Sequence, residues 1–424
     1  MKNYPLYRND GASGNDSVRL LADGIQVSND TRKTGRNNND LVIGPTGSGK
    51  TRYYCKPNLL QSEESMIITD TKGSLYEEFA DILKTEGYEV FCLDFENVSR
   101  SCGYNPFDYI RREGNNRFSE KDVMTMASCI VPLTSYREPY WELAGQFLVG
   151  SLISFLLEFA SPKDCNLKGM MRLFHETTIQ GEGKGKSRYQ YLMGEVKKKH
   201  PDSFAAKQFD MADCSAERTA SCVRSITASH LRAFDFRGAE NITGSGRSID
   251  LRRFGRRKCA LFVNVSDTDR SMDTLVNLFY TQAIHTLCYE ADHCYRNHSL
   301  PVPVRFYFDD FAAGTMIPDF DKIISTIRSR NISVSILLQS LSQLDQLYGP
   351  SAAATIVNGC DTLLYLGGQD VDTSDTIARK LNRPLGDVLY MPLDRGWLFL
   401  RGEEPKLVKR YPLEKHPKYH MLSE

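Results

Sequence analysis

The sequence lacks the features that mark secreted, membrane-spanning or strongly polyanion-binding chains. Its 53 Lys and Arg are balanced by 53 Asp and Glu, so the net charge indicates no class of partner. The 11 cysteines include no CxxC pair, which favours reduced thiols in a cytoplasmic protein. The N-terminus has no apolar core, so we expect no signal peptide. The longest apolar run, Phe147–Leu157, is shorter than the about 20 residues of a membrane span and predicts a buried core helix.

Positive charge is concentrated in one internal segment. From Lys184 to Lys258 the chain has 17 Lys and Arg against 8 Asp and Glu. Such a block fits a polyanion-binding surface, although a solvated basic face is the commoner explanation.

The N-terminal part alternates strands with a helix. Short apolar runs predict strands at Asp40–Ile43, Met66–Asp70 and Glu89–Asp94. Between the last two, Ser74 and Glu77 have the spacing of a capping box that opens a helix. Strand, helix and strand within so short a segment predict a βαβ unit and therefore a parallel sheet.

The middle of the chain has a helical pattern in place of alternating strands and helices. From about residue 122 to 233 the apolar residues recur with helical periodicity, and strands resume near Cys259–Val265, Val304–Phe308, Ser333–Leu338 and Thr362–Leu366. We therefore predict an α/β fold with a mostly parallel central sheet, interrupted by an all-α inserted domain. The predicted boundaries are 1–115 with 236–424 for the nucleotide-binding domain and 116–235 for the insertion.

The segment GPTGSGKT, residues 44–51, is a complete phosphate-binding loop between an apolar strand and a predicted helix. Glycines let successive backbone N–H groups converge on phosphates, Lys50 supplies a positive charge, and the Thr51 hydroxyl is a ligand for Mg²⁺. A glycine-rich turn alone would not explain Lys50 and Thr51. The predicted nucleotide-binding residues are Gly44, Thr46, Gly47, Ser48, Gly49, Lys50 and Thr51.

Hydrolysis also needs an acid that holds the metal and a base for the attacking water. Asp309 and Asp310 follow the strand Arg305–Phe308, so Asp309 is the expected metal ligand, with Thr51, and Asp310 the expected base. Asp70 also ends a strand, as a phosphate-side contact or as part of a turn. Gln339 closes another strand, either to sense the γ-phosphate and orient water or as an ordinary polar strand end.

Several segments, in order along the chain, together resemble the type IV coupling proteins, the conjugation ATPases of type IV secretion systems. They are Gly44–Thr51 followed by Lys56–Asn58, Thr69–Gly73, Tyr104–Pro106, Asp309–Ala312, Arg328–Ile332, Gln339–Leu344 and Asn358–Asp361 with Leu366 and Gly367. The resemblance runs from about residue 38 to 382. It implies a RecA-like P-loop NTPase domain with an all-α insertion, and ATP and Mg²⁺ as cofactors.

The resemblance further implies a DNA-stimulated ATPase that forms a homo-hexamer in the cytoplasm, at the inner face of the cell membrane. There it would deliver a relaxase bound to DNA, or another secreted protein, to components of the secretion channel. In such rings an arginine of the neighbouring subunit stabilises the transferring phosphoryl group. Arg328 and Arg330 are the two candidates, and a surface salt bridge is the alternative role for either.

DNA would be held through its phosphates by the basic residues Arg247, Arg252, Arg253, Arg256, Arg257 and Lys258, with the segment Lys184–Lys199. This sequence departs from the family in three respects: Asp310 stands where Glu is common, Thr71 and Ser74 replace the usual proline and glutamate, and no membrane-spanning helix precedes the loop.

Two other functions are left open. One is a nucleotide-switched substrate receptor or adaptor with little turnover, which Asp310 favours because its side chain is shorter than that of Glu. The other is a cytoplasmic DNA pump of the chromosome-partitioning or packaging kind.

Overall fold

The computed structural model describes residues 17–114, 117–133, 139–179, 186–213, 217–235, 237–244, 248–311 and 316–422. The chain divides into two compact units. The first, here called the helical unit, includes Leu93–Asp250 and Asp269–Ile284. The second, the sheet unit, includes Asn3–Cys92, Leu251–Thr268 and His285–Glu424. The domain boundaries inferred from the sequence stay a prediction.

A nine-stranded sheet has the order β11-β10-β9-β3-β8-β7-β4-β6-β5. The strands from β9 to β6 in this order run parallel, and β10 and β11 are antiparallel additions at one edge. The predicted mostly parallel α/β sheet is confirmed. The strands, including the separate hairpin β1–β2, are β1 Val18–Ala22, β2 Ile25–Ser28, β3 Asp40–Ile43, β4 Ser65–Asp70, β5 Glu89–Asp94, β6 Cys259–Asn264, β7 Val304–Phe308, β8 Ile332–Leu338, β9 Thr362–Tyr365, β10 Arg395–Leu400 and β11 Lys406–Lys409.

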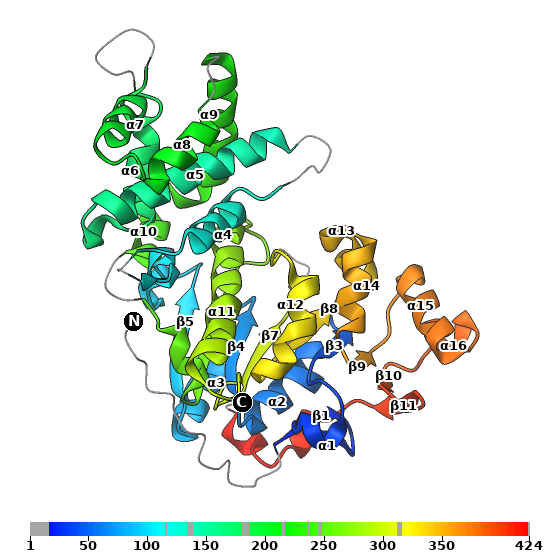
Figure 1. Cartoon of the computed structure of the whole chain (residues 1–424). Coiled ribbons are helices and arrows are strands. Elements are labelled where there is room, and N and C mark those ends of the chain that lie inside the picture. The colour runs from blue at the N-terminus through cyan, green and yellow to red at the C-terminus, as the bar shows by residue number, and fades with distance from the viewer. Residues whose placement is uncertain are drawn as a thin grey trace. The chain divides into compact units, whose positions relative to one another are not determined.

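Helices connect these strands and build the rest of the described chain (Figure 1). They are α1 Thr31–Thr34, α2 Lys56–Gln61, α3 Ser74–Thr85, α4 Glu120–Ile130, α5 Tyr140–Phe159, α6 Leu167–Glu176, α7 Arg188–Lys199, α8 Phe204–Ala212, α9 Glu217–Leu231, α10 Arg237–Thr243, α11 Asp273–Cys294, α12 Phe320–Thr326, α13 Leu341–Tyr348, α14 Pro350–Asn358, α15 Val371–Leu381 and α16 Leu385–Leu389.

The two faces of the sheet bury different sets of side chains because successive residues of a strand point to opposite faces. On one face Tyr307 of β7 packs in a core with apolar residues of α2, α3 and the β1–β2 hairpin. On the other face Phe308 lies 5.9 Å, ring centre to ring centre, from Phe320 of α12. With both faces covered, β3, β4, β7 and β8 are fully buried, as their apolar runs predicted.

The helical unit is built around α5, which packs against α4, α6, α8 and α9. By length and composition α5 could cross a membrane, with a mean hydropathy of 1.4, and no other helix in the described ranges could. Its interior position is clear from Ser151, whose hydroxyl donates to the carbonyl oxygen of Ala205 at 2.8 Å and lies 2.8 Å from the Tyr189 hydroxyl. The predicted core helix is thus packed inside the unit, with 61% of its apolar window buried.

One sequence prediction about a helix start is wrong. Ser74 does not cap α3; the capping position is Gly73, in the left-handed region at φ 69°, and no side chain at that position makes a capping bond. Asp70 does this work from the strand end, where its carboxylate accepts the N–H of Tyr76 at 2.9 Å and that of Lys72 at 3.4 Å. The capping spacing was a coincidence of composition, because a carboxylate four residues before Ser74 accepts the Tyr76 N–H that the cap would have bound.

Candidate nucleotide-binding site

The polar side chains predicted from sequence gather where parallel strands end. The phosphate loop follows β3. In the sheet order the next strands are β8, which is followed by Gln339, β7, which is followed by Asp309, and β4, which ends at Asp70. Because the carboxyl ends of parallel strands meet at one edge, these positions lie side by side there, as in other open α/β sheets that bind ligands.

The phosphate loop is held in a narrow turn. Gly44 N–H donates to the Leu338 carbonyl at 3.0 Å, and Ser48 N–H donates to the Pro45 carbonyl at 3.1 Å. Gly47 and Gly49 have φ of 79° and 81°, where a side chain would be strained. At Gly49 a Cβ would also lie 2.3 Å from the ring of Tyr53. The loop therefore requires these glycines for its conformation and for the close approach of Tyr53.

The helix after the loop begins with an unusual turn. Residues Thr51–Cys55 form a π-helical turn, in which Lys56 N–H reaches back to the Thr51 carbonyl, before α2 continues. Such turns are rare and concentrate at functional sites. Here it begins at Thr51, the predicted metal ligand, directly after Lys50.

Lys50 lies inside the loop. Its Nζ donates to the carbonyl oxygens of Gly44 at 2.6 Å and Pro45 at 3.4 Å. Burial lowers the pKa of Lys50, and the nearby carboxylates of Asp309 and Asp310 oppose this only in part. The ammonium group thus has a poorly solvated position that an anionic ligand would stabilise.

Thr51 and Asp309 form the candidate metal site. The Thr51 hydroxyl donates to Asp309 Oδ2 at 2.7 Å. Burial raises the pKa of Asp309, against the lowering effects of Thr51 and Lys50. A hydroxyl and a carboxylate oxygen side by side beneath a phosphate loop are the hard oxygen ligands that Mg²⁺ takes with phosphates, so the residues present fit this ion.

Asp310 is held in a conformation that few residues adopt. Its φ is 55°, in the left-handed region, at a typical cost of about 1–3 kcal/mol. Gln339 at the end of β8 directs its amide Nε2 to both carboxylate oxygens of Asp310, at 3.3 Å each. The predicted base and the predicted water-orienting amide are therefore brought together.

Asp70 is close enough to this cluster for the Asp309 charge to add to the effect of burial, which raises the pKa of Asp70. Its hydrogen bonds with the N–H groups of Lys72, in the turn before α3, and Tyr76, in the first turn of α3, fit the turn role that the sequence left open. A contact of Asp70 with phosphate stays a prediction.

Arg328 and Arg330 are not part of this cluster. Both lie in a 3₁₀ turn, Ile327–Arg330, that leads into the start of β8, whereas the phosphate loop lies at the carboxyl ends of the strands. Arg330 forms a two-pronged salt bridge with Asp292, Nε at 2.9 Å and Nη2 at 2.8 Å. Arg328 is exposed and donates to the Thr31 carbonyl at 3.3 Å, with no salt bridge to any residue in the described ranges.

The basic block is largely paired with acids where the structure describes it. Arg253 and Arg257 both bind Glu89, Arg256 binds Glu290 at 2.6 Å, and Lys258 binds Glu63. Arg247 and Lys184 lie outside the described residues. Ion pairing reduces the charge that this surface offers to phosphates, so the block is a weaker DNA-binding candidate than its composition indicated.

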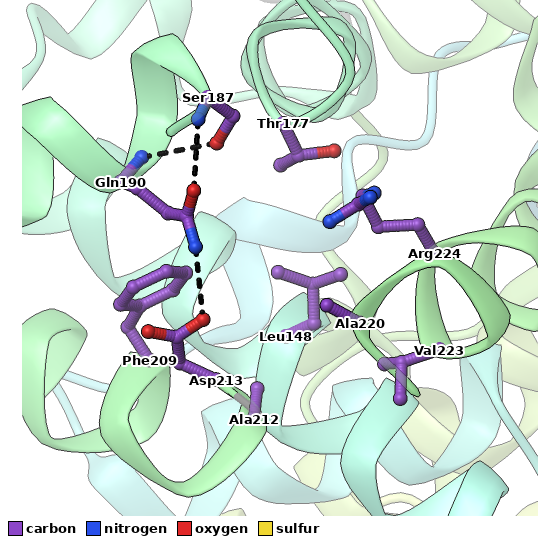
Figure 2. Close-up of a pocket in the computed structure, with 10 residues that line it drawn as sticks. All are labelled: Leu148, Thr177, Ser187, Gln190, Phe209, Ala212, Asp213, Ala220, Val223 and Arg224. Atoms are coloured by element: carbon purple, nitrogen blue, oxygen red, sulfur yellow. Dashed lines mark hydrogen bonds between the residues drawn. The ribbon is translucent and has the colours of Figure 1, made fainter. Parts of the chain in front are cut away.

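A small cavity of about 30 Å³ in the helical unit lies between α5, α7, α8 and α9 (Figure 2). Polar groups in its wall form hydrogen bonds with one another: the Gln190 side chain accepts from Ser187 N–H at 2.8 Å and donates to Asp213 at 3.1 Å. Ser187 and Gln190 form a true capping box at the start of α7.

Sequence reasoning missed one cation at the loop. Arg410, just after β11, donates to the Ser48 carbonyl at 2.7 Å. No motif marks this arginine, and β10 and β11 were themselves not predicted, so the sequence offered no signal for it.

A phosphate loop, an acidic strand end and a mostly parallel sheet together define a RecA-like P-loop NTPase fold. The sequence profile of the family described as Type IV secretory system Conjugative DNA transfer matches residues 12–383. The chain therefore belongs to this family, whose process is conjugative DNA transfer and whose partners are DNA and the secretory system. The family inferred from the sequence is confirmed.

Solved structures share the fold. The bacterial conjugative coupling protein TrwBdeltaN70 in complex with sulphate has a TM-score of 0.67 at 18% identity, covering 89% of this chain and 86% of its own. The plasmid coupling protein TrwB in complex with ADPNP has a TM-score of 0.68 at 18% identity, with coverages of 93% and 89%. VirB4 of Thermoanaerobacter pseudethanolicus has 0.54 at 13%, with 96% and 99%. A search of curated proteins finds no match.

Proposed function

We propose that this protein is an ATP-driven coupling protein, a motor that moves DNA into a type IV secretion channel. One observation carries the proposal: Lys50 and Thr51 of the phosphate loop lie beside Asp309, Asp310 and Gln339 at the carboxyl edge of the sheet. TrwB, which shares the fold, has been solved with ADPNP and with ADP and Mg²⁺.

The side chains divide the work of phosphoryl transfer. The loop N–H groups and Lys50 hold the phosphates and offset their charge. Thr51 and Asp309 would hold Mg²⁺, which supplies charge neutralisation on the phosphates when bound. Asp310 accepts the proton of the attacking water, and Gln339 orients Asp310 and that water through its amide group.

The arginine that completes the site comes from a second copy in a homo-hexamer. Of the two candidates Arg328 is the better one, because Arg330 forms a salt bridge with Asp292. Among the described residues the exposed Arg328 guanidinium binds one carbonyl. An arginine free to reach across to a neighbour can stabilise transition-state charge.

The protein works in the cytoplasm at the inner face of the cell membrane. It contacts DNA mainly through phosphates, and its all-α domain, residues 116–235, receives a relaxase or another secreted protein. The described part of the basic block offers few unpaired charges, so we expect a modest affinity for DNA with a shallow dependence on salt.

A nucleotide-switched receptor with little turnover is the second candidate. Asp310 favours it, because the shorter carboxylate is held in a strained backbone conformation and bound by Gln339. In such a protein ATP would set the conformation while the substrate protein docks.

The deciding experiment measures the ATPase rate with and without single- and double-stranded DNA, beside the particle mass in the same buffer. The motor hypothesis expects hydrolysis stimulated by DNA in an assembled ring and abolished by Lys50→Ala. Robust hydrolysis by a monomer that ignores DNA would contradict it. Relaxase binding with no turnover at saturating ATP would favour the receptor.

A further inference from the structure

Arg410 connects three separate segments through their main-chain carbonyl groups. Its Nη1 donates to Ser48 of the phosphate loop at 2.7 Å, and its Nη2 donates to Leu366, just beyond β9, at 2.9 Å. A weaker bond joins its Nε to Arg395, where β10 begins, at 3.4 Å. One guanidinium group thus ties the loop to the antiparallel edge of the sheet.

The bond to Ser48 has a direct effect on the loop. A trans peptide unit is planar, with its C=O and N–H pointing in opposite directions. When Arg410 holds the Ser48 C=O on one side, the Gly49 N–H is directed to the other. Loops of this kind bind phosphates through such N–H groups. Arg410 therefore orients the Gly49 N–H for phosphate without contacting the phosphate itself.

The surroundings of Arg410 add rigidity and charge. Its guanidinium carbon lies 5.6 Å from the centre of the Tyr53 ring, and that ring leaves no room for a side chain on Gly49. Arg410 forms no salt bridge with the residues that the structure describes, and burial lowers its pKa. A poorly solvated cation behind a phosphate loop is stabilised when an anion binds in front of it.

We propose that Arg410 is a positioning residue of the nucleotide site, which orients the Ser48–Gly49 peptide and adds positive charge behind the phosphates. Through the bonds to Leu366 and Arg395 it also makes the β9–β10 junction part of the phosphate-loop support. The interaction exists before hydrolysis begins and contributes equally to bound ATP and to the transition state. Its loss therefore affects mainly nucleotide binding.

The test measures DNA-independent ATP hydrolysis and binding of a non-hydrolysable ATP analogue in the full chain. Arg410→Ala is expected to raise the KM for ATP and the Kd for the analogue about tenfold, with kcat changed less than about threefold. Arg410→Lys keeps the charge but cannot make the fork, so about a threefold rise is expected. Arg401→Ala is the matched control, since this exposed arginine follows β10 and binds Asp361 and the Gly35 carbonyl.

A purely structural role gives a different pattern. It would lower the melting temperature of the nucleotide-free protein while the KM of the folded fraction and the stabilisation by the analogue stayed as in the wild type; this result overturns the proposal. If Arg410→Ala does not fold, Arg410→Lys decides, through a smaller analogue-induced shift at an unchanged nucleotide-free melting temperature. No DNA is present, so the outcome is independent of whether the protein moves DNA.

Discussion

The same parallel strands carry buried charges at both ends, and the two ends differ in how those charges are balanced. At the amino ends, Arg305 binds Glu64 at 2.6 Å and Asp40 at 3.4 Å, all almost fully buried. Tyr54 donates to Asp40 at 2.6 Å. At the carboxyl ends, the hydrogen-bond partners of Lys50 among the described residues are two carbonyl oxygens.

The pKa directions express this difference. Burial opposes the charge of Arg305, but Glu64, Tyr307, Asp40 and Tyr54 outweigh it and raise its pKa. At Lys50 burial outweighs the carboxylates and lowers the pKa. At the amino ends two buried arginines face two buried carboxylates, because Arg19 also binds Asp40 at 2.9 Å. At the carboxyl ends the charge of Lys50 is less well balanced, as is common for groups at functional sites.

The largest expected effect is a loss of turnover in an Arg328 variant, and it tests whether the amino ends of the strands have only a structural role. If Arg328 reaches the site of a neighbouring copy, Arg328→Ala lowers the DNA-stimulated kcat about 10³-fold, because transition-state charge loses its partner. Steady-state ATPase assays measure this.

Mixing Arg328→Ala with Lys50→Ala chains provides the control. A ring of both kinds regains part of the activity, since some sites then have an intact loop next to an intact arginine. Arg330→Ala, which frees Asp292, should instead act mainly through stability. A kcat for Arg328→Ala within about threefold of wild type argues against the neighbouring finger.

The second prediction concerns the buried salt bridges of Arg305 at the amino ends of the strands. Arg305→Leu leaves Glu64 buried without its cation and takes one of two cations from Asp40, which keeps Arg19 at 2.9 Å. It should destabilise the fold by about 3–5 kcal/mol. Urea denaturation of the nucleotide-free protein measures it. The matched control is Arg253→Leu, whose salt bridge with Glu89 is half exposed and should change stability by less than about 1 kcal/mol. Equal effects of the two would remove the contrast between the sites.

The smallest expected effect is a change in melting temperature caused by substitution of Asp309, at the carboxyl ends of the strands. Burial raises the pKa of Asp309 above its ordinary 3.8, so the folded state favours the protonated acid. Above that raised pKa the carboxylate opposes folding, and this opposition disappears as pH falls through it. Asp309→Asn should therefore raise the nucleotide-free melting temperature by a few degrees at pH 7 and lose that advantage on acidification.

The control for this prediction is Asp81→Asn. This carboxylate is 94% exposed and pairs with Lys84 at 2.9 Å. No comparable gain in melting temperature is expected there. A lower melting temperature for Asp309→Asn at pH 7 would show that Asp309 stabilises the fold without a ligand.

Elements set by residues close together in the sequence were predicted correctly, whereas those that depend on distant residues were not. Buried strands such as β3 and β8 were readable because each is a continuous apolar run. β10 and β11 were missed: β10 reads RGWLFL and β11 KLVK, and the second is mostly exposed at an edge. The capping box predicted at Ser74 was wrong because Asp70, a residue outside the helix, accepts the Tyr76 N–H.

The sequence by itself determined the phosphate loop, since glycines, lysine and threonine in eight consecutive residues encode their own backbone conformation. It also determined that Asp309 and Gln339 each follow a strand, whereas the sheet order shows that these two strands are neighbours. Only the tertiary structure decided what holds the loop: Arg410 reaches Ser48 across 362 residues. Only folding likewise decided that Arg330 forms a salt bridge, whereas Arg328 forms none with the described part of the chain. Salt bridges depend on distance in space, which no spacing along the chain records.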